Sequence, residues 1–251
     1  MDGCFTSLIT SRINIPSLYK YYIIVNGISK KLRNSNFQYN PPPHNGLDIL
    51  HIDSDLIIVN KPSGILSVPG RGEDKQDCMI SRVNQEYPGA LTIHRLDMET
   101  SGILIIARNE KSQSAMGKLF QSRNIKKQYI ALVNGIPKKN NGLINFPLIA
   151  DWPNRPKQKI DLIKGKPSST NYLVIESTEN ASRVKLTPIT GRSHQLRVHM
   201  LAIGHPILGD RLYASQDIID RADRLLLHAS FICFNHPITH EKITIKCPEP
   251  Y

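Results

Sequence analysis

Long apolar segments are missing from this chain of 251 residues. No run approaches the roughly 18 residues that a helix needs to span a bilayer, so we expect no contact with a membrane. The N-terminus also lacks the short apolar stretch of a secretory signal. These absences exclude a membrane protein and point away from secretion.

Cysteine is scarce and scattered. The four cysteines never form a Cys-x-x-Cys pair and lie at positions Cys4, Cys78, Cys233 and Cys247. This spacing excludes a disulfide framework and a zinc site, and it suits reduced thiols in the cytosol. We therefore expect a cytoplasmic protein, with organellar import as the alternative because the first residues are basic and poor in acid.

Acidic residues are outnumbered. The chain has 32 Lys and Arg against 21 Asp and Glu, a formal net charge of +11. A basic protein concentrates polyanions and releases counterions when it binds them, which favours a nucleic acid as partner. The alternative is a basic surface that is merely solvated.

Cofactor fingerprints are absent as well. The sequence has neither the glycine pattern of a dinucleotide site nor a phosphate-binding P-loop, and we expect no cofactor. Among the histidines, His194 and His199 are five residues apart, so on a helix they point away from each other. We expect no metal site.

The chain divides at a proline-rich segment. Residues 1–47 are basic and end in a linker, Asn40–Gly46, where prolines and glycine interrupt regular structure. We expect this extension to be largely disordered, with a transit peptide or an upstream start codon as alternatives. The catalytic domain is expected over residues 48–251.

Apolar patterning predicts an α+β fold with a mixed, mainly antiparallel sheet core and flanking helices, because most expected strands follow one another through turns. The expected strands are 49–52, 56–60, 103–107, 129–133, 172–176 and 183–186. One helix is expected over 110–123. A second should begin with Ser193 as its N-cap and end at Gly204.

The most informative segment is His94–Gly102, which reads His-Arg-Leu-Asp-Met-Glu-Thr-Ser-Gly and runs straight into the apolar Ile103–Ala107. A loop that feeds a buried strand is a usual place for reactive side chains. Beside the cation of Arg95, the Asp97 carboxylate can stay ionised and act as nucleophile or base. The alternative is a loop aspartate that bonds its own backbone.

This segment resembles the catalytic motif of the RluA family of RNA pseudouridine synthases. The resemblance extends from about Asn36 to the C-terminus. Its further motifs are Val59–Gly64, Lys127–Tyr129, Gly191–His199 and Gly204–Asp210, and Asp151–Lys159 narrows it to the founding branch of the family.

The resemblance implies an isomerase that flips a uridine out of RNA and converts it to pseudouridine without a cofactor. It also implies the pseudouridine synthase fold, a monomer, and two substrates: a tRNA anticodon stem-loop and a hairpin of 23S rRNA. A non-catalytic RNA-binding or folding factor on the same scaffold is the alternative. A hydrolase lacks the motif it would need.

The resemblance assigns catalytic roles to Asp97, Tyr129 and Arg197. We expect Arg197 to pair with Asp97 and to aim it, the alternative being a surface arginine at a helix end. Tyr129 offers an aromatic face for the base and a hydroxyl that serves as a base if its pKa is lowered; the alternative is a buried strand tyrosine.

RNA binding and base flipping are expected of a larger set, with Arg95 filling the stack that the uridine leaves or contacting a phosphate. That set is His94, Arg95, Lys127, Trp152, Arg155, Lys157 and Arg192. Leu226 and Leu227 are expected to line the uracil pocket, with a plain core strand as the alternative.

Overall fold

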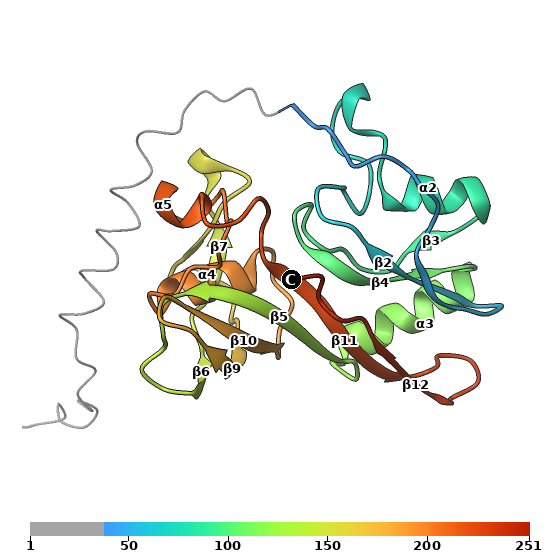
Figure 1. The fold of residues 1–251 in the computed structure, drawn as a ribbon. Helices are drawn as coiled ribbons and strands as arrows, with labels where there is room; N and C mark the ends of the chain where they lie inside the picture. Colours follow the sequence, from blue (N-terminus) through green and yellow to red (C-terminus); the bar gives the residue numbers. More distant parts are fainter. Residues whose placement is uncertain (1–37) are drawn as a thin grey trace, which may run out of the picture. The chain divides into compact units, whose positions relative to one another are not determined.

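A large mixed sheet organises residues 38–251, the part of the chain that the computed structural model describes. Its strands follow the order β1-β2-β4-β11-β5-β10-β9-β6, with β12 added on β11 and β3 on β4 (Figure 1). Strands β7 and β8 form a separate two-stranded sheet. The predictions for residues 1–37 lie outside the described residues.

The strands are β1 Ile49–Ile52, β2 Leu56–Lys61, β3 Leu91–Thr92, β4 Ser101–Ala107, β5 Lys126–Asn134, β6 Asn141–Ile144, β7 Leu148–Ala150, β8 Gln158–Ile160, β9 Thr170–Ser177, β10 Ala181–Pro188, β11 Leu227–Asn235 and β12 Lys242–Lys246. The α-helices are α2 Met79–Glu86, α3 Glu110–Gln121, α4 Gln195–Ala202 and α5 Gln216–Ile219. Two short 3-10 helices are η2 Glu73–Lys75 and η3 Trp152–Asn154.

The predicted fold class is confirmed. Within the described residues, the strand pairs of both sheets are antiparallel except for β4 and β11, which run parallel with His228 opposite Ser101 and Ala229 opposite Gly102. The expected hairpin at β1 and β2 and the expected helix α3 are also present. No described helix has the length and apolar character needed to cross a membrane.

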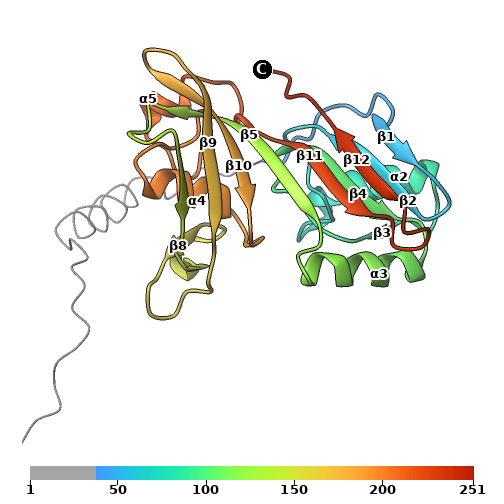
Figure 2. The same cartoon turned by 90° about the horizontal axis from the view of Figure 1, so that it is seen from below.

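Two apolar clusters fill the core, one on each side of the junction between β11 and β5. The first gathers β2 and β4 with α2 and α3, and the second gathers β5 and β10 with α4 (Figure 2). All seven residues of β4 are buried, which explains its unbroken apolar run. Tyr129 packs against both clusters, so β5 carries this side chain to the junction.

Several boundaries differ from those expected. Strand β5 begins at Lys126, three residues before Tyr129, because its pairing with β11 continues to Cys233. Helix α4 begins after His194, so the expected N-cap at Ser193 is wrong. His194 itself adopts the left-handed conformation with φ of 53°.

Residues 39–42, at the start of the predicted linker, pack on the folded domain. The Tyr39 hydroxyl donates to the carbonyl of Asp77 at 2.7 Å, and the Arg82 guanidinium donates to the carbonyl of Pro42 at 2.7 Å. Tyr39 is buried. The prolines here end regular structure, as predicted, but these tertiary hydrogen bonds hold the segment in place.

Gly102, at the start of β4, has no room for a side chain. Its φ is +105°, and a Cβ there would lie 2.4 Å from the carbonyl oxygen of Ala229 on β11. Only glycine fits both the conformation and the close approach of the two backbones. The last glycine of the aspartate motif therefore permits the parallel pair.

Replacing Gly102 by alanine should destabilise the protein by about 3 kcal/mol or more, because the added methyl group forces β4 and β11 apart in a strained conformation. Gly117→Ala is the matched control: this position in α3 has open space around it. It should stabilise by about 0.5–1 kcal/mol. Urea unfolding measures both, and effects of the same sign would contradict the assignment.

Candidate active site

Asp97 lies in the loop between β3 and β4, and hydrogen bonds to the backbone hold the residues on each side of it. Lys61 is fully buried, and its Nζ donates to the carbonyls of Pro62, Ile65 and Met98 at 2.8–2.9 Å. Three carbonyls therefore share the three donors of one ammonium group, and Met98 is tied directly to the end of β2.

On the other side of Asp97, Leu96 and Ser67 exchange two hydrogen bonds. The Ser67 hydroxyl donates to the Leu96 carbonyl at 2.8 Å and accepts the Leu96 backbone N–H at 3.0 Å. Burial lowers the pKa of Lys61 to about 7, against the raising effect of the Asp97 charge. Hydrogen bonds thus fix the backbone on both sides of Asp97.

The structure brings Arg197 to Asp97, as the sequence predicted. Arg197 Nη1 lies 3.6 Å from Asp97 Oδ2, within ion-pair range but longer than a hydrogen bond. The Arg197 side chain is 3% exposed and that of Asp97 is 28% exposed. The cation is therefore buried behind a carboxylate that still reaches solvent.

Arg197 makes its strongest bonds with Asp210, a residue to which sequence reasoning assigned no role. Arg197 Nε and Nη2 donate to the two Asp210 oxygens at 2.9 Å and 2.6 Å, a bidentate pair. Burial lowers the pKa of Arg197, but the bonds to Asp210 outweigh it and raise the pKa overall. Asp210 thus fixes the guanidinium and leaves Nη1 to face Asp97.

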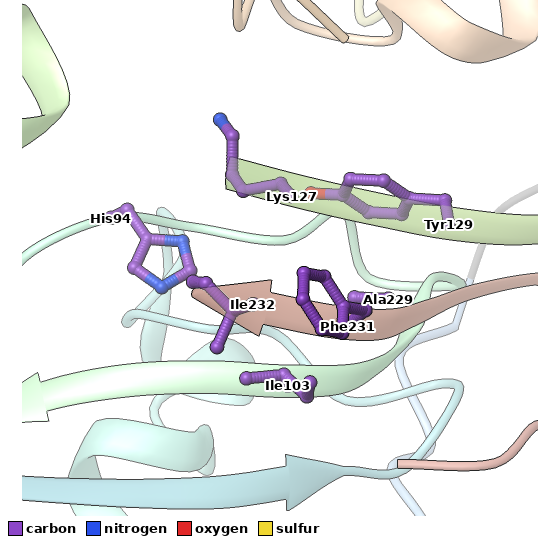
Figure 3. Close-up of a pocket in the computed structure, with 7 residues that line it drawn as sticks. All are labelled: His94, Ile103, Lys127, Tyr129, Ala229, Phe231 and Ile232. Atoms are coloured by element: carbon purple, nitrogen blue, oxygen red, sulfur yellow. The ribbon is translucent and has the colours of Figure 1, made fainter. Parts of the chain in front are cut away.

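Tyr129 lines a small pocket beside this pair, with an apolar wall from β4 and β11 (Figure 3). The lining residues are His94, Ile103, Lys127, Tyr129, Ala229, Phe231 and Ile232. Burial and the Asp97 charge raise the pKa of Tyr129. A raised pKa does not favour the hydroxyl as a base, so the aromatic face is the stronger of the two predicted roles.

His94 and Lys127 also belong to this pocket. His94 Nε2 accepts the backbone N–H of Ile105 at 2.9 Å, and burial lowers the His94 pKa to about 3. Lys127 lies over the Phe120 ring, 5.4 Å from its centre, and burial lowers its pKa too. Both side chains therefore shape the pocket wall, whereas free phosphate contacts had been expected of Lys127.

Leu226 and Leu227 do not belong to the lining of this pocket, and their role at the uracil stays a prediction. Leu227 is buried in the second core cluster, and Leu226 packs beside Leu208. Along β11 the wall comes from residues further on, at Ala229, Phe231 and Ile232. Tyr129 packs against the same apolar cluster in which Leu227 is buried.

The remaining predicted RNA contacts lie outside the pocket. Arg95 and Arg192 are exposed. The Arg155 guanidinium stacks over the Trp152 ring at 3.8 Å, and that ring is 65% exposed. Lys157 is half-buried, and burial lowers its pKa.

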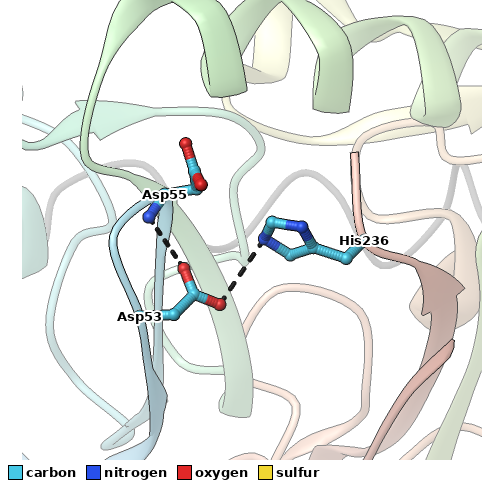
Figure 4. Close-up of side chains that lie close together, drawn as sticks. All are labelled: Asp53, Asp55 and His236. Carbon is cyan, nitrogen blue, oxygen red and sulfur yellow. Dashed lines mark hydrogen bonds and ion pairs between the residues drawn. The ribbon is translucent and has the colours of Figure 1, made fainter. Parts of the chain in front are cut away.

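A second group of ionisable side chains, Asp53, Asp55 and His236, has possible metal-ligand atoms within 4.8 Å of one another (Figure 4). His236 Nδ1 accepts the backbone N–H groups of Ile238 and Thr239 at 3.3 Å and 3.0 Å. The ring proton of the neutral imidazole is then on Nε2, 3.5 Å from Asp53 Oδ2. A nitrogen that carries a proton offers no lone pair, so these residues do not fit a metal ion.

The comparisons with known proteins agree with the motifs. Residues 55–202 match the family described as RNA pseudouridylate synthase. The dual-specificity RNA pseudouridine synthase RluA of Escherichia coli (strain K12) is 50% identical over 214 residues, 85% of this chain and 98% of that protein. This chain belongs to the RluA family of RNA pseudouridine synthases. The protein of the same name from Vibrio cholerae serotype O1 is 47% identical over 211 residues, 84% of this chain and 86% of that protein.

The solved structures agree with the assignment. Human RNA Pseudouridylate Synthase Domain Containing 1 matches this RluA-family chain with a TM-score of 0.70 and 30% identity, over 84% of this chain and 87% of the human one. The protein is therefore an isomerase that acts on RNA, and the non-catalytic alternative is not supported.

The Asp53 group yields a prediction on stability. Burial raises the Asp53 pKa, but hydrogen bonds from His51 and from the backbone N–H of Asp55 and Leu56 outweigh it, so the pKa is lowered in the folded state. A lowered carboxyl pKa stabilises the fold above the unfolded value and loses that effect as the pH falls. Asp53→Asn should therefore cost about 1–2 kcal/mol at pH 7.

That difference should shrink as the pH falls from about 4, the value of an unfolded Asp, through the lower pKa of the folded state, where the wild-type carboxyl becomes protonated and resembles the amide. Urea unfolding across this pH range measures it. Asp223→Asn, at an exposed position, is the control and should show neither effect. A difference that stays constant with pH would contradict the role of the ionised carboxylate.

Proposed function

We propose that this enzyme isomerises a flipped uridine in structured RNA with Asp97 as its catalytic carboxylate. The observation that carries the proposal is the pairing of Asp97 with the buried cation of Arg197, 3.6 Å away. Asp97 is also near enough to the pocket residue Tyr129 for its charge to raise the Tyr129 pKa. An anion held beside a fixed cation near an aromatic ring suits a reaction on a sugar and its base.

The reaction breaks the bond between C1′ of the ribose and N1 of the uracil and forms one between C1′ and C5. The C5 proton is released and N1 gains a proton, so atoms and charge balance without an oxidant or a co-reactant. The base has to turn between these two steps, which requires that it leaves its stack in the RNA.

Each route by which a carboxylate can assist needs an ionised oxygen within reach of the nucleoside. Arg197 supplies the cation that favours ionisation, and its bonds to Asp210 keep it from collapsing onto Asp97. Asp97 therefore retains one exposed edge for the substrate. Tyr129, protonated and buried at its hydroxyl, offers its face for stacking on the base.

Arg95 and Arg192 support the RNA-binding part of the proposal. Both are exposed and belong to the segments that carry Asp97 and Arg197, and a guanidinium plane can either fill the space of a flipped base or contact a phosphate. Trp152 and Arg155 form an exposed stack that suits an unpaired base in an RNA loop.

We infer that the substrates are RNA hairpins with splayed loop bases: a tRNA anticodon stem-loop, a 23S rRNA hairpin, or both. The similarity to proteins named dual-specificity RNA pseudouridine synthases supports this inference. We further expect residues 48–251 to form the catalytic domain and the enzyme to act as a cytoplasmic monomer. The free thiols of Cys78, Cys233 and Cys247 suit a reducing compartment.

Asp97→Asn should reduce pseudouridine formation by at least about 10³-fold, because the amide cannot supply the ionised oxygen. Tritium release from an RNA hairpin that carries [5-³H]uridine measures turnover, and filter binding measures the Kd, which should change little. Glu99→Gln removes one charge from the same loop and is the matched control; it should keep a rate close to wild type. Wild-type turnover by the Asp97 variant would sink the mechanism.

The exposed stack should affect binding rather than chemistry. Trp152→Ala should weaken RNA binding by about 1–3 kcal/mol, the range for one aromatic–base stack. Arg155→Gln should reduce the dependence of log Kd on log salt by roughly 0.7–0.9, as expected for one lost phosphate contact. Turnover at saturating RNA should be unchanged in both, and a lower saturated rate would place these residues in the chemistry.

A further inference from the structure

His194 lies on the side of Asp97 opposite to Arg197. It precedes α4, its side chain is 11% exposed, and its Nε2 lies 3.9 Å from Asp97 Oδ1. Arg197 Nη1 lies 3.6 Å from the other carboxylate oxygen, Oδ2. Each oxygen of Asp97 therefore faces one nitrogen, and both nitrogens come from the first turn of α4 and the residue before it.

The hydroxyl of Tyr213 determines which nitrogen of His194 carries the proton. Tyr213 Oη accepts the backbone N–H of Gln158 at 2.7 Å and lies 2.7 Å from His194 Nδ1. Burial raises the pKa of Tyr213, so the phenol keeps its proton and donates it to Nδ1. A neutral imidazole that accepts at Nδ1 carries its own proton on Nε2, which is the nitrogen that faces Asp97.

The same tyrosine also belongs to the Arg197 network. Its backbone N–H donates to Asp210 Oδ1 at 3.2 Å, and its ring centre lies 5.1 Å from the Arg197 guanidinium carbon. Burial lowers the pKa of His194, against the raising effect of Asp97. The groups that face Asp97 are thus one buried cation and one neutral N–H donor, joined through Tyr213.

The backbone at His194 shows that this placement is maintained at a cost. Its φ of 53° is in the left-handed region, where residues with a Cβ are strained. Glycine adopts that conformation freely, and asparagine and aspartate share with histidine a raised frequency there. Those residues would not place an imidazole next to the Tyr213 hydroxyl, as His194 does.

We propose that His194 is a positioning residue for Asp97, donating its Nε2–H to Oδ1 in the tautomer that Tyr213 selects. The proposal rests on the proposed function of Asp97. The distance of 3.9 Å is longer than a hydrogen bond, and catalytic hydrogen bonds commonly tighten only when the substrate binds. With Arg197 on the other oxygen, this donor fixes the rotation of the carboxylate about its last bond.

The test compares two replacements that share the backbone strain and differ in the donor. His194→Leu removes the N–H, whereas His194→Gln can place an amide N–H at a similar reach. Single-turnover tritium release at saturating enzyme should fall about 10²-fold in the Leu variant, as expected for a misplaced reactive group. The Gln variant should recover most of that loss, and the Kd for the RNA hairpin should stay close to wild type in both.

Tyr213→Phe supplies an independent arm because it leaves His194 in place and frees its tautomer. It should slow single turnover in the wild-type background and have no further effect in the His194→Leu background, since its hydroxyl acts through the histidine. Circular dichroism melts identify any variant that does not fold at the assay temperature, and the remaining variants then decide.

The proposal is overturned if the Leu and Gln variants lose rate equally, if the change is in Kd alone, or if the Tyr213 effect persists without His194. Asp97→Asn separates this failure from that of the proposed function. An inactive Asp97 variant beside a fully active His194→Leu variant refutes only the positioning role. An active Asp97 variant refutes the assignment on which it rests.

Discussion

A single buried guanidinium organises the reactive part of this enzyme. Arg197 is almost fully removed from solvent, a costly position for a charge unless it is paired and hydrogen-bonded. Asp210, equally buried, satisfies two of its nitrogens in parallel. Nη1 remains to face Asp97, so the ion pair with Asp210 and the ion pair with Asp97 share the same cation.

The Asp97 carboxylate has to be oriented and also has to stay accessible to the substrate, and this arrangement meets both requirements. A tight hydrogen bond from Arg197 would hold the carboxylate still but occupy Oδ2, the oxygen that His194 does not face and that is left for the substrate. A more distant cation would leave the Asp97 carboxylate accessible but would not orient it. Because Asp210 takes the strong bonds, Arg197 keeps its place whether or not Asp97 moves, and the carboxylate feels its charge at 3.6 Å without being captured.

Much of the fold was predictable because it has local causes. The apolar run of β4, the hairpin of β1 and β2 and the amphipathic face of α3 all follow from periodicity. The pairing of Arg197 with Asp97 followed from motif resemblance. The contact of His194 with Tyr213 did not, since it joins the ring to a hydroxyl 19 residues away in sequence.

Two features could not be predicted, for a similar reason. Asp210 was part of a matched motif, but nothing in its neighbourhood shows that its partner is Arg197, 13 residues earlier. The sequence also contains no sign that Ala229 and Phe231 of β11 line a pocket with Tyr129. Which stretch of a strand meets a cavity depends on its register with neighbouring strands, and the register between β11 and β5 shifts at a bulge between these two residues.

The place of β11 in the sheet has a consequence for how the enzyme comes into being. This strand lies between β4 and β5, although it is made long after both and ends only 16 residues from the C-terminus. Until it inserts, the two halves of the sheet share no hydrogen-bonded ladder, and the pocket beside Tyr129 lacks the wall formed by Ala229, Phe231 and Ile232. Closing such long chain loops slows folding. The two halves of the sheet are therefore joined only when this late strand has paired with both β4 and β5.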